Sequence, residues 1–371
     1  MNQQIRFATS PDGIRLAYAI HGTGPPLVKV ANWLSHLEFD WHSPVWRHWL
    51  TELGRDHLLR RYDERGSGLS DRAVPDFTFD AWIRDLEAVV DAAGLDRFSL
   101  FGMSQGGAVA IAYAVRHPER VSHLVLYGAY SRGRLARDPS AEQRAEAELL
   151  LHLTRVGWGT SNPAFRRVFT MLFFPDATPD HAASFDELQR VSSSPDDAVR
   201  FRRVFHGIDV TALVPQVRVP TLVLHARDDG MVPFDEGRRL ASQIPGARFV
   251  TLEGRNHILL ADEPAWPQFL AEVRAFLATA GPPPRAAPAA DSHKPDPLSN
   301  REREVLALVS AGLSNAQISD ELVLSIRTVE RHLSNIYTKF GLSGRSARAA
   351  AAVRGALQLR TDSEIGNRAR P

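Results

Sequence analysis

A serine between two glycines lies where an apolar run gives way to small residues. The segment from Phe98 to Gly107 reads FSLFGMSQGG, which places Ser104 in a Gly-x-Ser-x-Gly pattern. The apolar run predicts a strand over Phe98–Gly102, and the residues that follow predict a helix over Ala108–Arg116. A serine on such a sharp turn projects its hydroxyl above the sheet edge, and small neighbours avoid a clash there. This context makes Ser104 a candidate nucleophile.

Downstream residues supply the two groups that a nucleophilic serine needs. A serine hydroxyl reacts poorly unless a base takes its proton, and the base needs a carboxylate to orient it. Asp228 and Asp229 follow one predicted strand, and His257 follows another. These two strands are Thr221–His225 and Arg248–Leu252. Because the ends of parallel strands meet at one edge of a sheet, we expect these side chains near Ser104.

Each of these residues also has a purely structural interpretation. Ser104 would then be a tight-turn residue, the aspartates solvated loop acids, and His257 a hydrogen-bonded core histidine. The order serine, aspartate, histidine along the chain, with each residue just past a strand, favours a catalytic triad over three separate coincidences.

Alternating strand-like and helix-like runs must position these groups. They predict an α/β fold, with a mostly parallel sheet and helices on both of its faces. Residues 131–207 interrupt the alternation with helical, proline-punctuated sequence, so we expect an inserted helical lid. The other predicted strands are Ile5–Ala8, Ile14–Ile20, Leu27–Ala31, His57–Tyr62 and His123–Tyr127, and the other predicted helices are Phe79–Ala93, Pro233–Ile244 and Ala265–Ala278.

A proline-rich segment divides the chain. Residues 281–297 read GPPPRAAPAADSHKPDP, and prolines remove backbone donors and disfavour helix in the residue before them. This composition predicts a semi-extended linker. We therefore expect the α/β domain over 1–280, a small helical domain over 298–360 and a disordered tail over 361–371.

Composition narrows the class of protein. Apolar residues make up 44% and charged residues 23% of the 371 residues, as in globular proteins that bury a core. The absence of cysteine excludes disulfides and thiolate nucleophiles. We see neither a signal-peptide pattern nor a run near the roughly 20 apolar residues of a membrane helix, and expect a cytoplasmic protein without a membrane partner. His36, His42 and His48 lack metal-site spacing, so we expect no metal and no cofactor.

The segment after the linker is helical in pattern and mildly basic. From Ser292 to the end it has 12 basic and 8 acidic residues, a net charge of +4. Ser299 and Glu302 form a capping-box pattern, which predicts the start of a helix. Gly312 is expected to end this helix. Two more helices, the second amphipathic, then predict a helix-turn-helix that reads the DNA major groove. Those helices are Ser314–Glu321 and Ile326–Phe340, and the apolar face of the second comprises Ile326, Val329, Leu333, Ile336, Tyr337 and Phe340.

Three motifs resemble those of the α/β-hydrolase family, and the resemblance spans residues 1–280. Residues 62–71, YDERGSGLSD, resemble the Asp-x-Arg-Gly-x-Gly-x-Ser segment of the family. Residues 102–107 resemble its nucleophile elbow, and residues 225–233, HARDDGMVP, resemble its acid loop. The resemblance implies an α/β-hydrolase sheet with a helical lid and a pocket for a small molecule.

The same resemblance assigns roles to the candidate residues. It implies that Ser104 is the nucleophile and His257 the base. In the alignment with the acid loop, Ala226 stands at the usual glycine and Asp229 at the acid, so the resemblance selects Asp229. Asp228 is the runner-up. The assignments together imply hydrolysis of an ester, a lactone or a related bond.

The oxyanion hole and the histidine loop depart from the family pattern. The resemblance implies that the backbone N–H groups of Trp33 and Gln105 form the oxyanion hole, but Asn32 occupies a place that is usually glycine. Arg255 and Asn256 precede the histidine where small residues are more usual. Neither departure removes a triad group, but a poorly formed oxyanion hole would leave a binding domain with a nearly silent triad.

Residues 298–359 closely resemble the LuxR-type DNA-binding domain, which implies double-stranded DNA as a partner and a homodimer on two half-sites. The family more often has a basic residue where Glu330 stands, although a glutamate can accept from cytosine N4. The alternative is a helical protein-docking module with solvated charges. The resemblance places Glu330, Arg331 and Ser334 against bases and Thr328, His332 and Lys339 near phosphates. Its matching residues include Arg301, Glu302, Val305, Leu306, Gly312, Leu313, Ser325, Val329, Asn335, Ile336, Tyr337, Gly341 and Leu342.

Two functions follow from these two resemblances. The first is a DNA-binding transcriptional regulator whose hydrolase-like domain binds or hydrolyses a small molecule. The second is an active serine hydrolase, of esterase or lactonase type, with an accessory DNA-binding tail. The two are compatible, since a slow hydrolase can also sense its substrate. A scaffold with both sites inactive is less attractive because all three triad groups are present.

Overall fold

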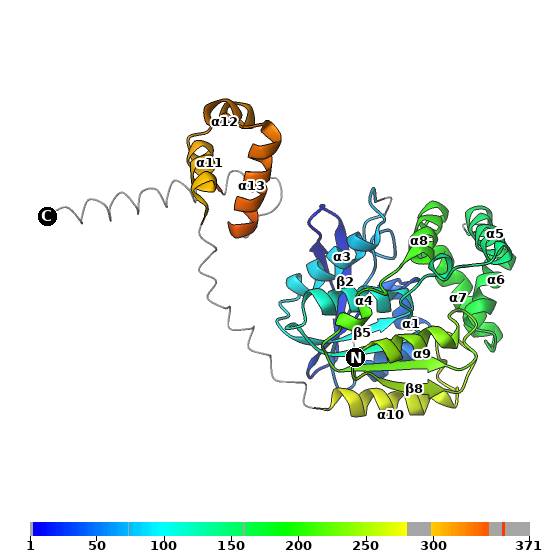
Figure 1. Ribbon diagram of the computed structural model, residues 1–371. Helices are drawn as coiled ribbons and strands as arrows, with labels where there is room; N and C mark the ends of the chain where they lie inside the picture. Colours follow the sequence, from blue (N-terminus) through cyan, green and yellow to red (C-terminus); the bar gives the residue numbers. More distant parts are fainter. Residues whose placement is uncertain (1–2, 73, 159, 280–297, 341–350, 353–371) are drawn as a thin grey trace. The chain divides into compact units, whose positions relative to one another are not determined.

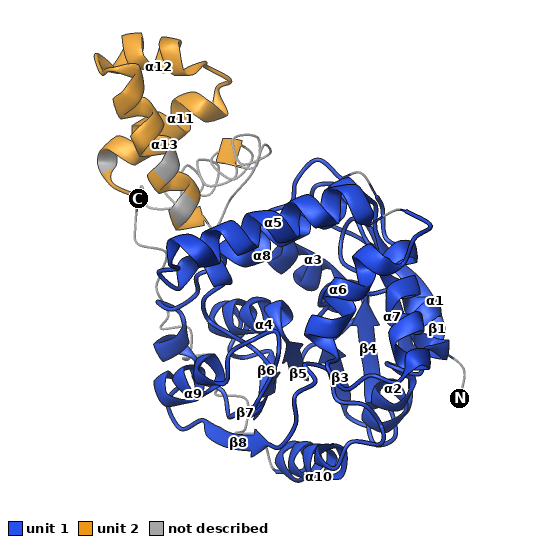
Figure 2. Cartoon of the chain, turned by 90° about the vertical axis from the view of Figure 1, so that its right-hand side faces the viewer, with its two compact units in different colours: residues 1–285 blue, residues 286–371 orange. Residues whose placement is uncertain are grey.

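The computed structural model describes residues 3–72, 74–158, 160–279, 298–340 and 351–352. The chain forms two compact units, unit 1 over Met1–Arg285 and unit 2 over Ala286–Pro371 (Figure 2). Three expectations lie outside the described residues: the linker over 281–297, the tail over 361–371, and most of the 298–360 domain beyond residue 340.

One eight-stranded sheet forms the centre of unit 1, in the order β1-β2-β4-β3-β5-β6-β7-β8 (Figure 1). The hairpin of β1 and β2 is antiparallel, as is the pairing of β2 with β4, and every pair from β4 to β8 is parallel. The expected mostly parallel sheet is confirmed. Its strands are β1 (Gln4–Thr9), β2 (Arg15–His21), β3 (Pro26–Lys29), β4 (Leu58–Tyr62), β5 (Phe98–Met103), β6 (Val121–Tyr127), β7 (Thr221–Ala226) and β8 (Arg248–Leu252).

Helices cover both faces of this sheet. A Cβ on Gly102 of β5 would lie 2.8 Å from the Cβ of Ala110 on α4. The ring of its neighbour Phe101 lies 6.2 Å, between centres, from that of Phe269 on α10. Because successive strand residues point to opposite faces, α4 and α10 lie on opposite sides. The helices of unit 1 outside the lid include α1 (Leu37–His42), α2 (Arg47–Leu53), α3 (Phe79–Ala92), α4 (Gln105–Arg116), α9 (Phe234–Gln243), α10 (Ala265–Leu277) and the short η2 (Val214–Gln216).

The segment between β6 and β7 is helical, as expected of residues 131–207, and we call it the lid. Its neck is closed by backbone hydrogen bonds, from Val210 N–H to the Ser131 carbonyl at 2.9 Å and from Gly133 N–H to the Ile208 carbonyl at 2.7 Å. Both views show α5 and α8 on the side of unit 1 away from α10 (Figures 1 and 2). The lid comprises η1 (Arg134–Ala136), α5 (Ala141–Gly157), α6 (Ala164–Phe173), α7 (Pro179–Ser192) and α8 (Pro195–Gly207).

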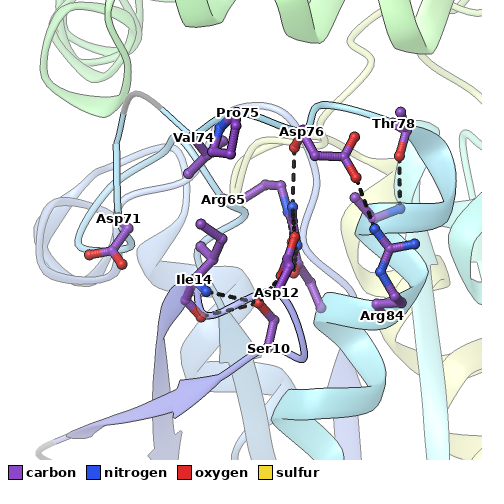
Figure 3. A network of polar contacts seen from close by, with 12 residues as sticks. Ser10, Asp12, Ile14, Arg65, Asp71, Val74, Pro75, Asp76, Thr78 and Arg84 are labelled. Carbon is purple, nitrogen blue, oxygen red and sulfur yellow. Dashed lines mark hydrogen bonds and ion pairs between the residues drawn. The ribbon is translucent and has the colours of Figure 1, made fainter. Parts of the chain in front are cut away.

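A buried arginine in the loop after β4 joins three parts of unit 1. The Nε and Nη2 groups of Arg65 donate to the two carboxylate oxygens of Asp85 at 2.8 and 2.6 Å. Its Nη1 donates to Asp12 Oδ2 at 2.8 Å and to the Asp76 carbonyl at 3.1 Å (Figure 3). These bonds tie the β1–β2 turn and the loop to α3.

The buried carboxylate of Asp63 accepts backbone hydrogen bonds that hold the same loop in place. Its Oδ2 accepts hydrogen bonds from the backbone N–H groups of Leu37 at 3.1 Å and Leu69 at 2.9 Å. Gly68 has a φ of +53°, and a Cβ there would lie 2.1 Å from the same oxygen. Glycine is therefore required for both backbone conformation and space. The segment that resembles the family's Asp-x-Arg-Gly motif thus serves the architecture of unit 1.

Unit 2 is a three-helix arrangement within residues 298–340. Its helices are α11 (Asn300–Ser310), α12 (Asn315–Leu322) and α13 (Ile326–Phe340). The expected capping box is present, with the Ser299 hydroxyl accepting from Glu302 N–H and the Glu302 carboxylate accepting from Ser299 N–H. Gly312, with a φ of +88°, follows the C-cap of α11. The buried core comprises Val305, Leu306, Val309, Ile318, Val329, Leu333, Ile336 and Ala351.

One expectation about this core is wrong. Ile326 was expected on the apolar face of α13, but it is 49% exposed. It is the first residue of its helix, one turn before the buried Val329, and so it precedes the part of α13 that packs on α11 and α12. Val323, in the turn just before it, is 90% exposed and has a left-handed φ of +52°.

Removing one partner of the buried Arg65–Asp85 pair tests its importance. Asp85→Ala leaves a buried guanidinium with one carboxylate fewer, and we expect it to lower the free energy of unfolding by about 3–5 kcal/mol. The measurement is urea unfolding of the full chain. The control is Asp71→Ala, which breaks the more exposed Arg15–Asp71 pair and should cost below about 1 kcal/mol. Equal losses in the two variants would contradict this account.

Candidate active site and nucleic-acid interface

Ser104 lies at the sharp turn between β5 and α4, as the sequence predicts. Its backbone has a φ of 53° and a ψ of −129°, a strained conformation that non-glycine residues rarely adopt. A Cβ on Gly106 would lie 2.5 Å from the Ala31 carbonyl oxygen, and one on Gly107 would lie 2.4 Å from the Ala129 Cβ. The glycines therefore permit the close packing that keeps the serine raised at the sheet edge.

His257 and Asp229 are brought together at the ends of β8 and β7. His257 Nδ1–H donates to Asp229 Oδ2 at 2.7 Å, and both side chains are 1% exposed. The other oxygen, Oδ1, accepts from the backbone N–H groups of Met231 at 2.8 Å and Val232 at 2.9 Å. The alternative acid, Asp228, is exposed. The geometry thus favours Asp229 as the orienting carboxylate.

The surroundings keep Asp229 ionised. Burial by itself raises the pKa of its carboxyl group, but the charge and hydrogen bond of His257, the nearby His225 and the Val232 N–H together bring the pKa below its ordinary value. An ionised carboxylate here holds the proton of His257 on Nδ1 and leaves the lone pair on Nε2.

Ser104 and His257 each lie next to one of two consecutive residues at the end of β6. Ser104 N–H donates to the Tyr127 carbonyl at 3.1 Å. The next residue, Gly128, lies so close to the imidazole that a Cβ would be 3.0 Å from His257 Cε1. The buried Nε2 of His257 has no hydrogen-bond partner among the residues described. This nitrogen is the one that a serine base must keep available.

The two residues expected to form the oxyanion hole border the same cavity as Ser104. Gln105 is the first residue of α4, and its side chain donates to Glu64 Oε1 at 3.0 Å. Burial raises the pKa of Glu64 to about 8, so this acid is largely neutral at pH 7. Trp33 is buried and stacks on Trp158 of the lid, with ring centres 5.2 Å apart.

The departures from the family pattern are accommodated by polar contacts. Asn32, at the usual glycine place, is buried; its Oδ1 accepts from Lys29 Nζ and its Nδ2 donates to the Trp33 carbonyl at 3.4 Å. Asn256, just before the histidine, is also buried and donates to Glu263 Oε1 at 2.9 Å. Both asparagines thus brace loops that carry candidate site residues.

The lid contributes three arginines and a histidine that sequence reasoning missed. The cavity that contains Ser104 is lined by Arg134, Arg137, Arg202 and His206, together with aromatic and aliphatic side chains of the lid. One signal was available: Ala198, Phe201 and Phe205 of α8 form a buried stripe, and Arg202 falls on it. An arginine on the apolar face of an amphipathic helix indicates either a buried ion pair or a ligand.

The expected DNA-reading residues lie on α13. Arg327, Glu330 and Arg331 are exposed, whereas Thr328 and His332 are half-buried. The side chain of Ser334, expected against a base, lies outside the description. Lys339, expected near a phosphate, forms an ion pair with Glu302 of α11 at 2.8 Å. The Lys339 side chain therefore also braces the helices of unit 2.

The described residues contain no group of three or more His, Asp or Glu side chains placed to hold a metal ion. No helix within them combines the length and the apolar character that crossing a membrane requires.

Comparison with known families gives a match for each unit. A family model described as alpha/beta hydrolase fold matches residues 38–264. A second model, described as bacterial regulatory proteins, luxR family, matches residues 296–352. Fold and site thus define an α/β-hydrolase domain followed by a helix-turn-helix domain. The chain belongs to the α/β-hydrolase fold family and carries a luxR-family domain, which makes it a DNA-binding regulator with a hydrolase-type domain.

Similar proteins share the hydrolase part. A 2-hydroxy-6-oxo-2,4-heptadienoate hydrolase from Pseudomonas putida is 30% identical over 236 residues, which are 60% of this chain and 74% of that protein. A pyrrolizixenacetamide deacetylase from Xenorhabdus hominickii is 27% identical, over 71% of this chain and 94% of its own. Among solved structures, the esterase RhEst1 from Rhodococcus sp. ECU1013 has a TM-score of 0.60 at 26% identity, covering 75% of this chain and 99% of the esterase.

His206, which lines the cavity, makes stability depend on pH. Burial, reinforced by Arg202, Arg134 and Arg137, lowers the pKa of His206 to about 3. Below the unfolded-state pKa of about 6.5, the imidazole is protonated in the unfolded chain but stays neutral in the folded chain. The free energy of unfolding therefore decreases as the pH is lowered from about 6.5 to about 3. Between pH 7.5 and 5, His206→Gln should reduce this fall by about 2 kcal/mol in urea unfolding. An unchanged pH dependence would refute a neutral, buried His206.

Proposed function

We propose that this DNA-binding regulator responds to a small molecule whose ester or related acyl bond unit 1 cleaves by serine acyl transfer. The observation that carries the proposal is the His257–Asp229 hydrogen bond of 2.7 Å, which leaves the buried Nε2 unpartnered. The imidazole lies against Gly128, the residue after the Tyr127 carbonyl that accepts from Ser104 N–H. The backbone N–H groups of Trp33 and Gln105, two residues that border the same cavity as Ser104, are the proposed donors to an oxyanion.

The proposed reaction follows from these positions. Ser104 Oγ attacks the acyl carbon while its proton passes to His257 Nε2, and the N–H groups of Trp33 and Gln105 stabilise the oxyanion. His257 returns the proton to the leaving oxygen as the acyl–oxygen bond breaks. Water, deprotonated by the same nitrogen, then releases the acid and restores Ser104. Asp229 stays ionised and stabilises the imidazolium in both steps.

The lid must move for a ligand to enter. The cavity has a volume of about 40 Å³, which is room for a few water molecules only. Lid side chains such as Phe173 and Phe205 form part of its wall. Opening of α5–α8 over the sheet edge is the motion by which occupancy would be sensed.

On the DNA side, we place the exposed face of α13 in the major groove. Arg331, Glu330 and Ser334 would face bases, and Thr328, His332 and Lys339 would lie near phosphates. The DNA-bound form is proposed to be a homodimer that reads two half-sites, in the cytoplasm. The exposure of Arg327, Glu330 and Arg331 on one helix supports this assignment.

Substitution of the triad tests the hydrolytic part. Ser104→Ala should abolish labelling by a serine-directed fluorophosphonate and lower kcat for short-chain 4-nitrophenyl esters by at least about a thousandfold. Asp229→Asn should lower kcat by about ten-thousandfold, because the imidazole loses its orienting carboxylate. The neighbouring Asp228→Asn is the matched control and should retain the wild-type rate. Equal activity in wild type and Ser104→Ala would rule out this nucleophile.

Removal of Arg331 tests the DNA-binding part. Arg331→Ala should weaken binding to a promoter fragment from the chain's own operon by about ten- to a hundredfold in fluorescence anisotropy, because a bidentate base contact is lost. Arg218→Ala in unit 1 removes an equal charge and should leave the affinity unchanged. Wild-type affinity should fall steeply with salt. No DNA affinity, or affinity independent of salt, would refute a DNA-reading α13.

The alternative, a working hydrolase with an accessory tail, predicts no coupling between the units. Fluorophosphonate-labelled and unlabelled protein would then bind the same DNA equally. A change in DNA affinity on labelling, absent in Ser104→Ala, would support the ligand-responsive regulator.

A further inference from the structure

Arg202 of α8 is a buried cation in the candidate active-site cavity. Its side chain is fully buried, at 1% exposure, and borders the cavity that contains Ser104. Two of its donor nitrogens, Nε and Nη2, have no hydrogen-bond acceptor among the residues described. Buried polar groups are almost always hydrogen-bonded, so this pair of donors calls for an explanation.

The neighbours of Arg202 are aromatic rings. Its guanidinium carbon lies 4.7 Å from the ring centre of Trp33, 4.1 Å from that of Phe169 and 5.9 Å from that of Phe205. Burial, followed by the like charge of Arg134, lowers the pKa of Arg202 to about 9, and no carboxylate of the described part of the chain offsets them. Arg202 is therefore still protonated at pH 7. Stacking on aromatic rings returns less than the burial of an unpaired charge costs.

Two other buried arginines of unit 1, Arg65 and Arg166, show these donors in use. Arg65 uses the same edge, Nε and Nη2, to hold both oxygens of Asp85. Arg166, elsewhere in the lid, donates to the carbonyl groups of Asp186, Trp158 and Thr160. Arg202 has the same Nε and Nη2 edge, but no carboxylate among the described residues accepts hydrogen bonds from it. The free edge of a guanidinium matches the spacing of two carboxylate oxygens.

We infer that Arg202 binds a carboxylate of the ligand, separate from the acyl bond at Ser104. The inference rests on the proposed function, since it names the class of molecule that the same cavity takes: an ester or lactone that also bears a free carboxylate. The ring of Trp33, whose backbone N–H is the proposed oxyanion donor, touches both Arg202 and the cavity. The carboxylate and the scissile bond would thus lie on either side of this tryptophan.

The other cations of the cavity favour an anion without competing for it. Arg134 is paired with Glu146 at 2.9 Å, and Arg137 donates to the Arg132 carbonyl at 2.8 Å. They raise the local positive potential, whereas Arg202 supplies the unused donors. A bound carboxylate would complete the ion pair that Arg202 lacks and would help to hold the lid helix α8 over the site.

Two matched pairs of substrates test this inference in the full chain. The first pair is mono-4-nitrophenyl adipate and methyl 4-nitrophenyl adipate, with the carboxylate free or blocked on the acyl side. The second is 4-acetoxybenzoate and its methyl ester, with the carboxylate on the leaving group. Wild type should prefer the free carboxylate in at least one pair, and Arg202→Met should reduce that ratio of kcat/KM about ten- to a hundredfold. Arg202→Lys, which keeps the charge without the fork, should recover only part of it.

The neighbouring Arg203 provides the matched control. Arg203 is exposed on the same helix, and Arg203→Met should leave the ratio at its wild-type value. Arg202→Met should also unfold at an equal or higher urea concentration than wild type, because an unpaired buried charge has been removed. A merely structural arginine predicts the reverse: lower stability with no change in the ratio. Equal ratios in wild type and Arg202→Met, or no wild-type preference in either pair, would overturn the inference.

A binding measurement separates this inference from the hydrolytic proposal. Ser104→Ala protein is titrated calorimetrically with monomethyl adipate and with dimethyl adipate. If wild type cleaves no ester but Ser104→Ala binds the monoester in an Arg202-dependent way, hydrolysis is refuted and the carboxylate site stands. If wild type cleaves esters through Ser104 without regard to the carboxylate, and Ser104→Ala binds both diacid derivatives alike, the carboxylate site is refuted and hydrolysis stands.

Discussion

The hydrogen bond between His257 and Asp229 is the contact on which the candidate site of unit 1 depends. Its two partners follow different strands, β8 and β7, and they meet only because parallel pairing aligns the carboxyl ends of those strands. The Met231 and Val232 N–H groups hold the other carboxylate oxygen, and Gly128 leaves space beside the ring. Each of these local features would cost folding free energy elsewhere in the protein. Together they give one imidazole a fixed orientation and an available Nε2.

Two buried arginines of unit 1, Arg65 and Arg202, differ in how their hydrogen-bond donors are used. The Nε, Nη1 and Nη2 groups of Arg65 all donate hydrogen bonds, to Asp85, Asp12 and a backbone carbonyl, and the result is a fixed framework. Around Arg202 the same type of side chain is surrounded by rings, and part of its hydrogen-bonding capacity is unused. Stability alone would favour an apolar residue at that position. The contrast is the reason for proposing a ligand contact at Arg202 of the lid.

Much of this arrangement could be predicted from sequence because the relevant signals are local. The turn at Ser104 requires small neighbours at fixed offsets, and the Ser299–Glu302 capping box is a four-residue pattern. Strand positions followed from short apolar runs, and the helix after Ser104 was misjudged only at its start, at Gln105 rather than Ala108. The apolar stripe of α8 could have marked Arg202 as enclosed, but which residues it faces depends on how the lid helices pack, and this is not a local signal.

Two separate cores limit how unit 1 could influence unit 2. The helix-turn-helix unit has a hydrophobic core of its own around Val305 and Leu333, and unit 1 has another around its sheet. Neither unit therefore needs the other's packing in order to fold, and an empty pocket does not prevent α13 from forming. A ligand can then act on DNA binding only through its differential affinity for arrangements that expose or pair the reading helices. Movement of the lid on binding of an anion would supply that difference, because it changes the surface of unit 1 while leaving the core of unit 2 intact.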